Sequence, residues 1–343
     1  MYREISSQFL DIGDHLVDKR VLVTGGAGAI GSNLVKALTA LGSQVVVVDD
    51  LSSGYLQNLH GVEDRIEFVQ GDISQGNVLA QLFEYRFDLI FHLAAFFANQ
   101  NSVEHPEEDL TTNGMGTLKV CRMAARTRAG RLVFISSSCV YGSAEGAISE
   151  EMPRDPHTPY AMTKILGEHY VDFYRQHHSL DTVILRYFNS FGPGEYPGRY
   201  RNVIPNFFEA AMAGEPLPLT GTGEETRDFT FVEDTVRGTL LAGVVPSAVG
   251  QTLNIGTGRE TPIADLALAI NEIVGNTAGV VYRRRRNWDR ISRRCACIER
   301  AEGLIGYRPL VSLEEGLRAT YRWFLELARG PARLAVEQRA SGV

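Results

Sequence analysis

A tyrosine and a lysine four residues apart carry the clearest chemical signal in this chain. Tyr160 and Lys164 share a face if they lie on a helix. An ammonium beside a phenol favours the phenolate, so it lowers a phenol pKa that starts at about 10. Ser137, within a serine-rich segment, is available to hydrogen-bond the same substrate oxygen. The three residues predict that Tyr160 is a general base, although such a pair taken alone is often only a surface pair.

A glycine-rich turn at residues 21–31 indicates the kind of cofactor that would act together with that base. An apolar run leads into Gly25, Gly28 and Gly31, and a helical pattern follows. In a dinucleotide-binding turn the first glycine permits the tight turn, the second admits a pyrophosphate, and the third lets the helix pack close to the strand. Free N–H groups at the helix start would then bind the pyrophosphate. The spacing is GxxGxxG rather than GxGxxG, so an ordinary strand–turn–helix is the alternative.

Asp49 supports the dinucleotide interpretation. The valine-rich run at 44–48 ends at this residue, about twenty positions after the glycines. A carboxylate there would bind the hydroxyls of the adenosine ribose and would repel a 2′-phosphate. The turn and Asp49 together predict NAD as the cofactor and favour it over NADP.

A run of arginines suggests how a substrate is held. Residues 283–286 are all arginine, and Arg290, Arg293 and Arg294 follow closely. Arginine pairs bidentately with phosphate oxygens, and one diphosphate needs two or three such side chains. We therefore expect a diphosphate partner and expect the remaining arginines to be solvated. A wholly solvated charge run or a nucleic-acid patch is the alternative.

Composition narrows the function classes. The chain has 343 residues, of which 44% are apolar and 22% charged, as in ordinary globular proteins with one large domain or two unequal ones. A net charge of −7 argues against a general nucleic-acid binder. The four cysteines lack the paired spacing of a zinc site, so we expect no metal and free thiols in a reducing compartment.

No membrane or export signal is apparent in the sequence. The longest apolar stretch, 89–98, contains His92 and is far short of the roughly 18 residues that a membrane span needs. Residues 1–19 mix charged and apolar side chains, unlike the basic-then-apolar order of a signal peptide. We therefore expect a cytoplasmic protein with no membrane partner.

The elements that must position these residues alternate along the chain. Apolar, β-rich runs alternate with helical patterns, which is typical of a parallel sheet covered by helices. The expected strands are 21–24, 45–49, 66–70, 89–93, 132–136, 182–187 and 251–255, and the expected helices are 32–41, 109–128, 159–176, 203–213 and 228–241. The sequence therefore predicts an α/β fold, a Rossmann-like doubly wound parallel sheet.

A smaller, discontinuous substrate-binding region is expected towards the C-terminus, because Gly- and Pro-rich sequence begins after Asn189. Ser312 is a plausible cap for a last helix that begins with Glu314 and Glu315 in its first turn. The expected organisation is an N-terminal extension at 1–18, an NAD-binding domain at 19–190 to which 228–256 return, a substrate-binding region at 191–227 and 257–329, and a tail at 330–343.

Together these features resemble a known family. The matching segments are Thr24 to Gly31, Asp49 to Gly54, Gly71-Asp72, His92 to Ala95, Asn113, Ser136 to Ser138, Tyr160 with Lys164, Arg186 to Asn189, and Thr226 to Phe229. From about residue 19 to 321 the chain resembles the extended short-chain dehydrogenases/reductases, and within them the NAD-dependent sugar-nucleotide epimerases and dehydratases, most of all those like UDP-hexose 4-epimerases.

The resemblance implies a role for each matched position. Tyr160, Lys164 and Ser137 would be catalytic, and Asn113 would support the active-site backbone. The NAD-binding residues would be Gly25, Gly28, Ala29, Ile30, Gly31, Asp49, Asp50, Ser53, Gly54, Asp72, Ile73, Leu93, Ala94, Ala95, Tyr160 and Lys164. The substrate-binding residues would be Ser137, Ser138, Cys139, Asn189, Asn202, Val203, Arg227, Arg286 and Asp289. Relatives commonly dimerise through the helices at 109–128 and 159–176, which implies a homodimer.

Two positions bear on the reaction. In the related dehydratases Ser138 and Cys139 are replaced by Asp and Glu, and the related UDP-glucuronate decarboxylases carry Glu at the second position. This chain has neither carboxylate, and cysteine is a poor substitute for Glu. We therefore expect an NAD-dependent epimerase of a nucleotide-diphosphate sugar, acting at C4 of a UDP-hexose or UDP-hexuronate through a transient 4-keto sugar. The alternatives are a dehydratase, a UDP-glucuronate decarboxylase, and a non-catalytic NAD(H) sensor.

Overall fold

Seven parallel strands form the centre of the molecule, a computed structural model that describes residues 10–82, 84–97, 99–144, 146–285 and 291–329. The strand order is β12-β7-β5-β4-β1-β2-β3. The bounds are β1 Arg20–Thr24, β2 Gln44–Asp49, β3 Ile66–Gln70, β4 Leu89–His92, β5 Arg131–Ser137, β7 Thr182–Tyr187 and β12 Thr252–Ile255. This confirms the predicted Rossmann-like sheet, with each strand end within one residue of its predicted position.

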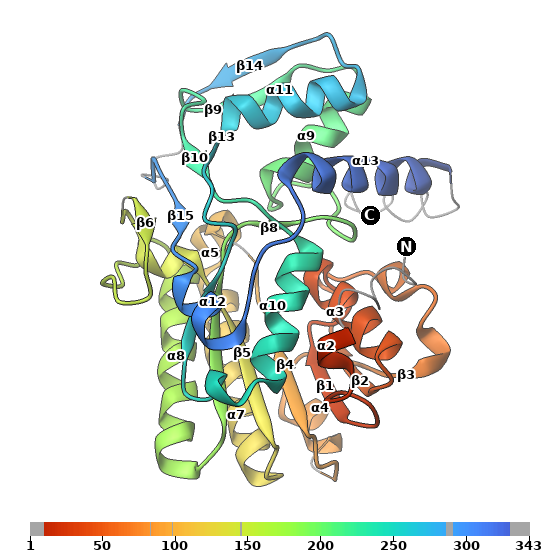
Figure 1. The fold of residues 1–343 in the computed structure, drawn as a ribbon, viewed down its shortest axis with the longest axis vertical. Coiled ribbons are helices and arrows are strands. Elements are labelled where there is room, and N and C mark those ends of the chain that lie inside the picture. Colours follow the sequence, from red (N-terminus) through yellow and green to blue (C-terminus); the bar gives the residue numbers. More distant parts are fainter. Residues whose placement is uncertain (1–9, 83, 98, 145, 286–290, 330–343) are drawn as a thin grey trace.

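Helices cover both faces of the sheet (Figure 1). Val21 and Val23 of β1 face one core with residues of α3 and α10, whereas Leu22 faces the other core with residues of α7 and α8. Strands buried on both faces read as continuous apolar runs, which is why they were visible in the sequence. The helices around the sheet are α2 Leu10–Gly13, α3 Ala29–Ala40, α4 Gly76–Gln81, α5 Asn99–Glu104, α6 Pro106–Asp109, α7 Thr117–Arg126, α8 Pro159–His178, α10 Val232–Val244 and α12 Glu299–Ile305.

The strand order reverses between β1 and β4. β1 pairs with β2 on one side and with β4 on the other, all in parallel. In open α/β sheets a crevice forms at such a reversal, outside the carboxyl ends of the strands. The loops that leave β1, β4 and β5 therefore meet at one place.

A second group of elements lies beyond the carboxyl ends of the strands, at the top of Figure 1. Its helices are α9 Val203–Met212, α11 Ile263–Val274 and α13 Leu313–Arg329. Its strands are β9 Leu217–Thr220, which pairs with β14 Val280–Arg283, and β10 Thr226–Arg227, which pairs with β13 Thr261–Pro262.

Two further strand pairs connect this group to the sheet. β8 Ser190–Phe191 pairs with β11 Thr230–Phe231, and β6 Ala147–Ile148 pairs with β15 Cys295–Ala296. Both pairs join segments that are far apart in the sequence. They bring the ends of β5 and β7 close to the C-terminal part of the chain.

Two predicted helices differ from the structure. The helix expected at 228–241 begins only at Val232, because Asp228 instead accepts backbone hydrogen bonds from Thr257, Gly258 and Ala296. The helix expected at 109–128 runs without a break from Pro106 to Arg126, but Leu110–Gly116 within it are π-helical rather than α-helical. A π-helical turn inside an α-helix is common at functional sites.

The last helix begins where the sequence predicts. The Ser312 hydroxyl accepts a hydrogen bond from the Glu315 amide at 3.3 Å, and the Ser312 amide donates to the Glu315 carboxylate at 2.9 Å. This reciprocal pair is a capping box, which confirms the predicted cap of α13. Among the described residues, none of the helices is both long and apolar enough to cross a bilayer.

Candidate active site

The turn after β1 forms a close-packed cradle. Gly25 has a φ of +73°, and a Cβ there would lie 2.7 Å from the backbone nitrogen of Ala94. A Cβ on Gly31 would lie 2.1 Å from the carbonyl oxygen of Gly25, so the helix start and the turn touch directly. Gly28 is the N-cap of α3 and no side chain caps that helix. Its first turn therefore offers backbone N–H groups and a dipole suited to a pyrophosphate.

Asp49 lies at the end of β2, beside this turn. Its two carboxylate oxygens accept hydrogen bonds from the amides of Ala27 and Leu51, at 2.9 and 2.8 Å. Burial raises the pKa of Asp49, although these two hydrogen bonds oppose the shift. A carboxylate has about four lone-pair sites, so acceptor capacity remains for ribose hydroxyls. The turn and Asp49 fit the adenosine half of NAD.

One cavity of about 510 Å³ extends from this turn to the ends of β5 and β7. Its walls include almost all the residues predicted from the sequence, which lie on nine segments of the chain. They are Gly25, Gly28, Ala29, Ile30, Gly31, Asp49, Asp50, Ser53, Gly54, Asp72, Ile73, Leu93, Ala94, Ala95, Ser137, Ser138, Cys139, Tyr160, Lys164, Asn189, Asn202 and Arg227. A single hollow thus joins the predicted cofactor residues to the predicted substrate residues.

Three predicted substrate residues are not placed on the cavity wall. Val203 is half-buried and packs against the main core, and it is not among the lining residues. Arg286 and Asp289 lie outside the residues that the structure describes.

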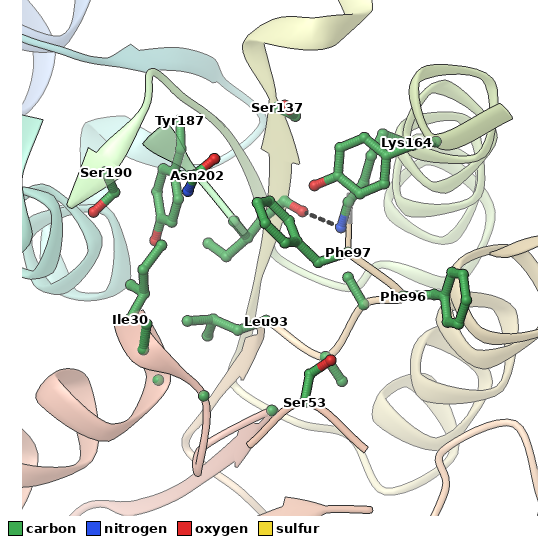
Figure 2. A pocket seen from close by; sticks show the side chains of 18 of the residues that line it. Ile30, Ser53, Leu93, Phe96, Phe97, Ser137, Lys164, Tyr187, Ser190 and Asn202 are labelled. Carbon is green, nitrogen blue, oxygen red and sulfur yellow. Dashed lines mark hydrogen bonds between the residues drawn. The ribbon is translucent and has the colours of Figure 1, made fainter. Parts of the chain in front are cut away.

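Tyr160 and Lys164 lie on one face of α8, as the spacing predicts. Both side chains are buried. The Lys164 Nζ lies 5.6 Å from the centroid of the Tyr160 ring and donates a hydrogen bond to the carbonyl oxygen of Ile135 at 2.9 Å. Figure 2 shows this hydrogen bond as a dashed line, with Ser137 at the end of β5 and Phe97 nearby.

The electrostatics of the pair differ from the expectation. Burial raises the pKa of Tyr160 above its usual value, and the hydrogen bond from Ser137 only partly opposes this. Loss of solvation thus dominates the pKa of Tyr160, and the lowering expected from Lys164 is not seen in this arrangement. Burial also lowers the pKa of Lys164 to about 8, against the opposing charges of Asp109 and Glu168.

A buried polar cluster supports this face of α8. The Asn113 side-chain oxygen accepts a hydrogen bond from the Phe96 amide at 2.8 Å, which fixes the loop after β4. Its nitrogen donates to Asp109 at 2.8 Å, and the Thr163 hydroxyl donates to the same carboxylate at 2.6 Å. Asn113 thus supports the backbone beside the active site, as predicted, from the π-helical segment.

The substrate side of the cavity is built around the loop after β5. The Ser137 hydroxyl accepts a hydrogen bond from the Cys139 amide at 3.2 Å, and Asn99 donates to the Cys139 sulfur at 3.3 Å. Ser138 is buried, and with Cys139 it gives this part of the cavity wall a hydroxyl and a thiol.

The other predicted substrate residues are held by neighbouring groups. Asn189 donates to the carbonyl oxygen of Asp228 at 2.9 Å, and Asn202 donates to the Glu195 carboxylate at 2.7 Å. Arg227 donates to the carbonyl oxygen of Thr226 at 2.8 Å. These contacts orient the side chains along one wall of the cavity.

Sequence reasoning missed four charged residues of this cavity, Glu108, Glu195, Arg201 and Arg294. Glu195 lines it and is buried, which raises the pKa of its carboxyl to about 7. Arg294 lines it as well and is only 3% exposed, so the expectation that the later arginines are solvated is wrong for Arg294. The only hint in the sequence is that Arg294 directly precedes the small apolar pair Cys295-Ala296, which forms β15.

Known proteins resemble the chain over nearly its whole length. The model of the NAD dependent epimerase/dehydratase family matches residues 21–256. A UDP-glucose 4-epimerase of Mycolicibacterium smegmatis is 39% identical over 309 residues, covering 89% of this chain and 98% of the relative. The UDP-glucuronic acid decarboxylase 1 of Xenopus tropicalis is 35% identical, covering 89% and 72%. The solved structure of the epimerase Mth375 from Methanothermobacter thermautotrophicus superposes with a TM-score of 0.92 at 48% identity, covering 94% and 97%.

Proposed function

The chain belongs to the NAD dependent epimerase/dehydratase family, and from this premise we propose that it inverts C4 of a UDP-hexose or a UDP-hexuronate. As a member of that family it is an enzyme and its cofactor is NAD. The observation that carries the proposal is the loop after β5, where Ser138 and Cys139, neither of which is a carboxylate, line the cavity together with Tyr160. Elimination of water needs an added acid and base, which these two side chains do not supply.

The proposed chemistry starts with Tyr160. Its phenolate oxygen takes the proton of the C4 hydroxyl while Ser137 holds that oxygen by a hydrogen bond. When bound, NAD⁺ supplies the hydride acceptor and a positively charged nicotinamide ring. A cation next to Tyr160 offsets the burial that raises its pKa. Lys164, with its ammonium at the ring face, adds to that offset.

The second half reverses these steps on the other face of the sugar. The 4-keto sugar turns within the cavity, C4 regains its hydride, and Tyr160 returns the proton to the C4 oxygen. At the end of each turnover the cofactor has thus returned to its starting oxidation state, and Tyr160 has returned to its starting protonation state. We propose that Asn189, Asn202 and Arg227 hold the nucleotide diphosphate during the turn, together with Arg286 and Asp289, which lie outside the described residues.

The substrate is tested directly. Purified protein with NAD⁺ is incubated with UDP-glucose, UDP-N-acetylglucosamine or UDP-glucuronate, and the sugar protons are followed by NMR. Interconversion of two C4 epimers without net NADH supports the proposal and names the sugar. A 4-keto sugar that has lost water, or a UDP-pentose formed by loss of the carboxyl group, contradicts it in favour of a dehydratase or a decarboxylase. If none of these sugars is converted, the result favours a non-catalytic NAD(H) sensor.

A further inference from the structure

Arg294 differs from the other described arginines of its run because it is buried. Arg283, Arg284 and Arg293 are exposed, whereas Arg294 is 3% exposed and precedes β15. The pairing of β15 with β6 fixes the backbone next to it. The fold therefore holds this guanidinium at a set place in the cavity wall.

Its hydrogen bonds leave it without a counter-charge among the described residues. One terminal nitrogen donates to the carbonyl oxygen of Gly142 at 3.1 Å, and the other to the Cys139 sulfur at 3.6 Å. Sulfur is a weak acceptor. The buried Nε has no hydrogen-bond partner at all. Arg186, another buried arginine, is by contrast paired with the Glu168 carboxylate at 2.7 Å.

The buried guanidinium of Arg294 is expected to bind an anion. Burial of an ionised group is costly unless it is paired and hydrogen-bonded. The planar guanidinium matches a carboxylate or phosphate bidentately. Because Arg294 lines the cavity, the missing partner is best supplied by the substrate.

The position of Arg294 indicates which anion it meets. It contacts Cys139, whose amide is bonded to the Ser137 hydroxyl, so it flanks the place proposed for C4. In a hexopyranose, C6 is attached to the direct neighbour of C4, whereas the diphosphate leaves C1, on the opposite side of the ring. The only ring substituent near C4 that carries a charge in common hexoses is a carboxylate at C6.

We propose that Arg294 binds the C6 carboxylate of a UDP-hexuronate, so that the enzyme selects an acidic sugar over a neutral hexose. This inference rests on the proposed C4 chemistry, since it uses Tyr160 and Ser137 to place the sugar. It assigns Arg294 a role in specificity rather than in hydride or proton transfer.

The test compares NAD-loaded wild type with Arg294→Gln and Arg294→Lys. Calorimetry gives the affinities for UDP, UDP-glucose and UDP-glucuronate, and NMR gives kcat/KM for the two sugars. A charge-assisted bidentate contact corresponds to a loss of about 30- to 100-fold for UDP-glucuronate in Arg294→Gln. Binding of UDP and of UDP-glucose should change less than about threefold, and Arg294→Lys should recover part of the loss.

Several results would overturn the inference. An equal loss for both sugars indicates general damage to the site, and a loss of UDP affinity indicates a contact with the diphosphate. If the melting curve shows that Arg294→Gln does not fold, the affinities of the wild-type protein test the proposal. Tighter binding of UDP-glucose than of UDP-glucuronate then contradicts it. Preferential binding of UDP-glucuronate followed by loss of its carboxyl group supports Arg294 while refuting the proposed epimerase.

Discussion

Lys164 places its ammonium 5.6 Å from the centre of the Tyr160 ring while donating its hydrogen bond to the carbonyl oxygen of Ile135. The lysine is thus anchored to β5, and it acts on the phenol through its charge at the ring face. Since burial keeps the pKa of Tyr160 high, the phenol depends on nearby positive charge to act as a base.

Replacing Tyr160 should therefore separate chemistry from binding. Tyr160→Phe keeps the ring and its packing but removes the proton acceptor. We expect sugar turnover to fall by about 1,000-fold, within the range typical of a general base, while NAD binding and the melting temperature stay near wild type. The measurements are NMR turnover, NAD titration and thermal unfolding. Turnover within about threefold of wild type would refute the role of Tyr160.

Gly28 and Gly31 offer a matched pair for testing the cradle. A Cβ on Gly28 would approach the Gly25 oxygen to 3.2 Å, and its φ of −71° suits any residue. A Cβ on Gly31 would lie 2.1 Å from the same oxygen, so that backbone must move. We expect Gly28→Ala to fold with a free energy of unfolding within about 1 kcal/mol of wild type, but to bind NAD at least about tenfold more weakly.

Gly31→Ala should instead lower the free energy of unfolding by more than about 2 kcal/mol, because the helix and the turn cannot both stay in place. Urea unfolding and NAD titration of both variants check this pair. Full NAD affinity in Gly28→Ala would mean that the pyrophosphate does not approach this glycine.

The sheet and the cradle could be predicted from sequence because their signals are local. Strands buried on both faces are continuous Val and Ile runs, and the glycine turn needs its glycines at fixed positions. Arg294 could not be predicted in this way, since the small apolar pair that follows it, Cys295-Ala296, is only a weak local signal. Its burial depends on the pairing of β15 with β6, a contact between distant parts of the chain.

The same distinction applies to the helices. The helix predicted to begin at Asp228 starts four residues later because that carboxylate binds amides of a distant loop. The π-helical segment was missed as well, since its apolar spacing is close to that of an α-helix. In both places the tertiary contact, rather than local preference, decides the structure.

We predict a homodimer through α8 and the neighbouring π-helical segment. Leu110, Met115, Met162 and Phe173 on these two segments are about half exposed, and the segments contact each other. Exposed apolar groups gathered on adjacent helices favour association. Light scattering should give twice the chain mass of 37.9 kDa at micromolar concentration.

Met162→Glu should shift that mass towards the monomer, because it places a charge within the proposed contact. Leu268→Glu serves as the control, since Leu268 is exposed on α11, away from these helices. A wild-type monomer, or equal effects of the two substitutions, would reject this interface.

Glu195 should make substrate binding depend on pH. Its carboxyl lines the cavity, accepts a hydrogen bond from Asn202 at 2.7 Å, and has its pKa raised to about 7 by burial, with Arg201 opposing the shift. Below pH 7 the group is neutral, and above it carries a negative charge that repels a diphosphate. The affinity for UDP-glucose, whose diphosphate does not titrate near neutrality, should thus fall about three- to tenfold between pH 6 and pH 8.

Glu195→Gln isolates this effect because the amide has nearly the same shape and cannot ionise. In that variant the affinity should be nearly constant between pH 6 and pH 8, at about the wild-type value of pH 6. Glu224→Gln is the control, because Glu224 is exposed and lies outside the cavity lining. Calorimetry on the NAD-loaded proteins measures the affinity of wild type, Glu195→Gln and Glu224→Gln. A pH dependence that survives in Glu195→Gln would assign the titration to another group of the cavity, of which Lys164, with its pKa lowered to about 8, is the first to examine.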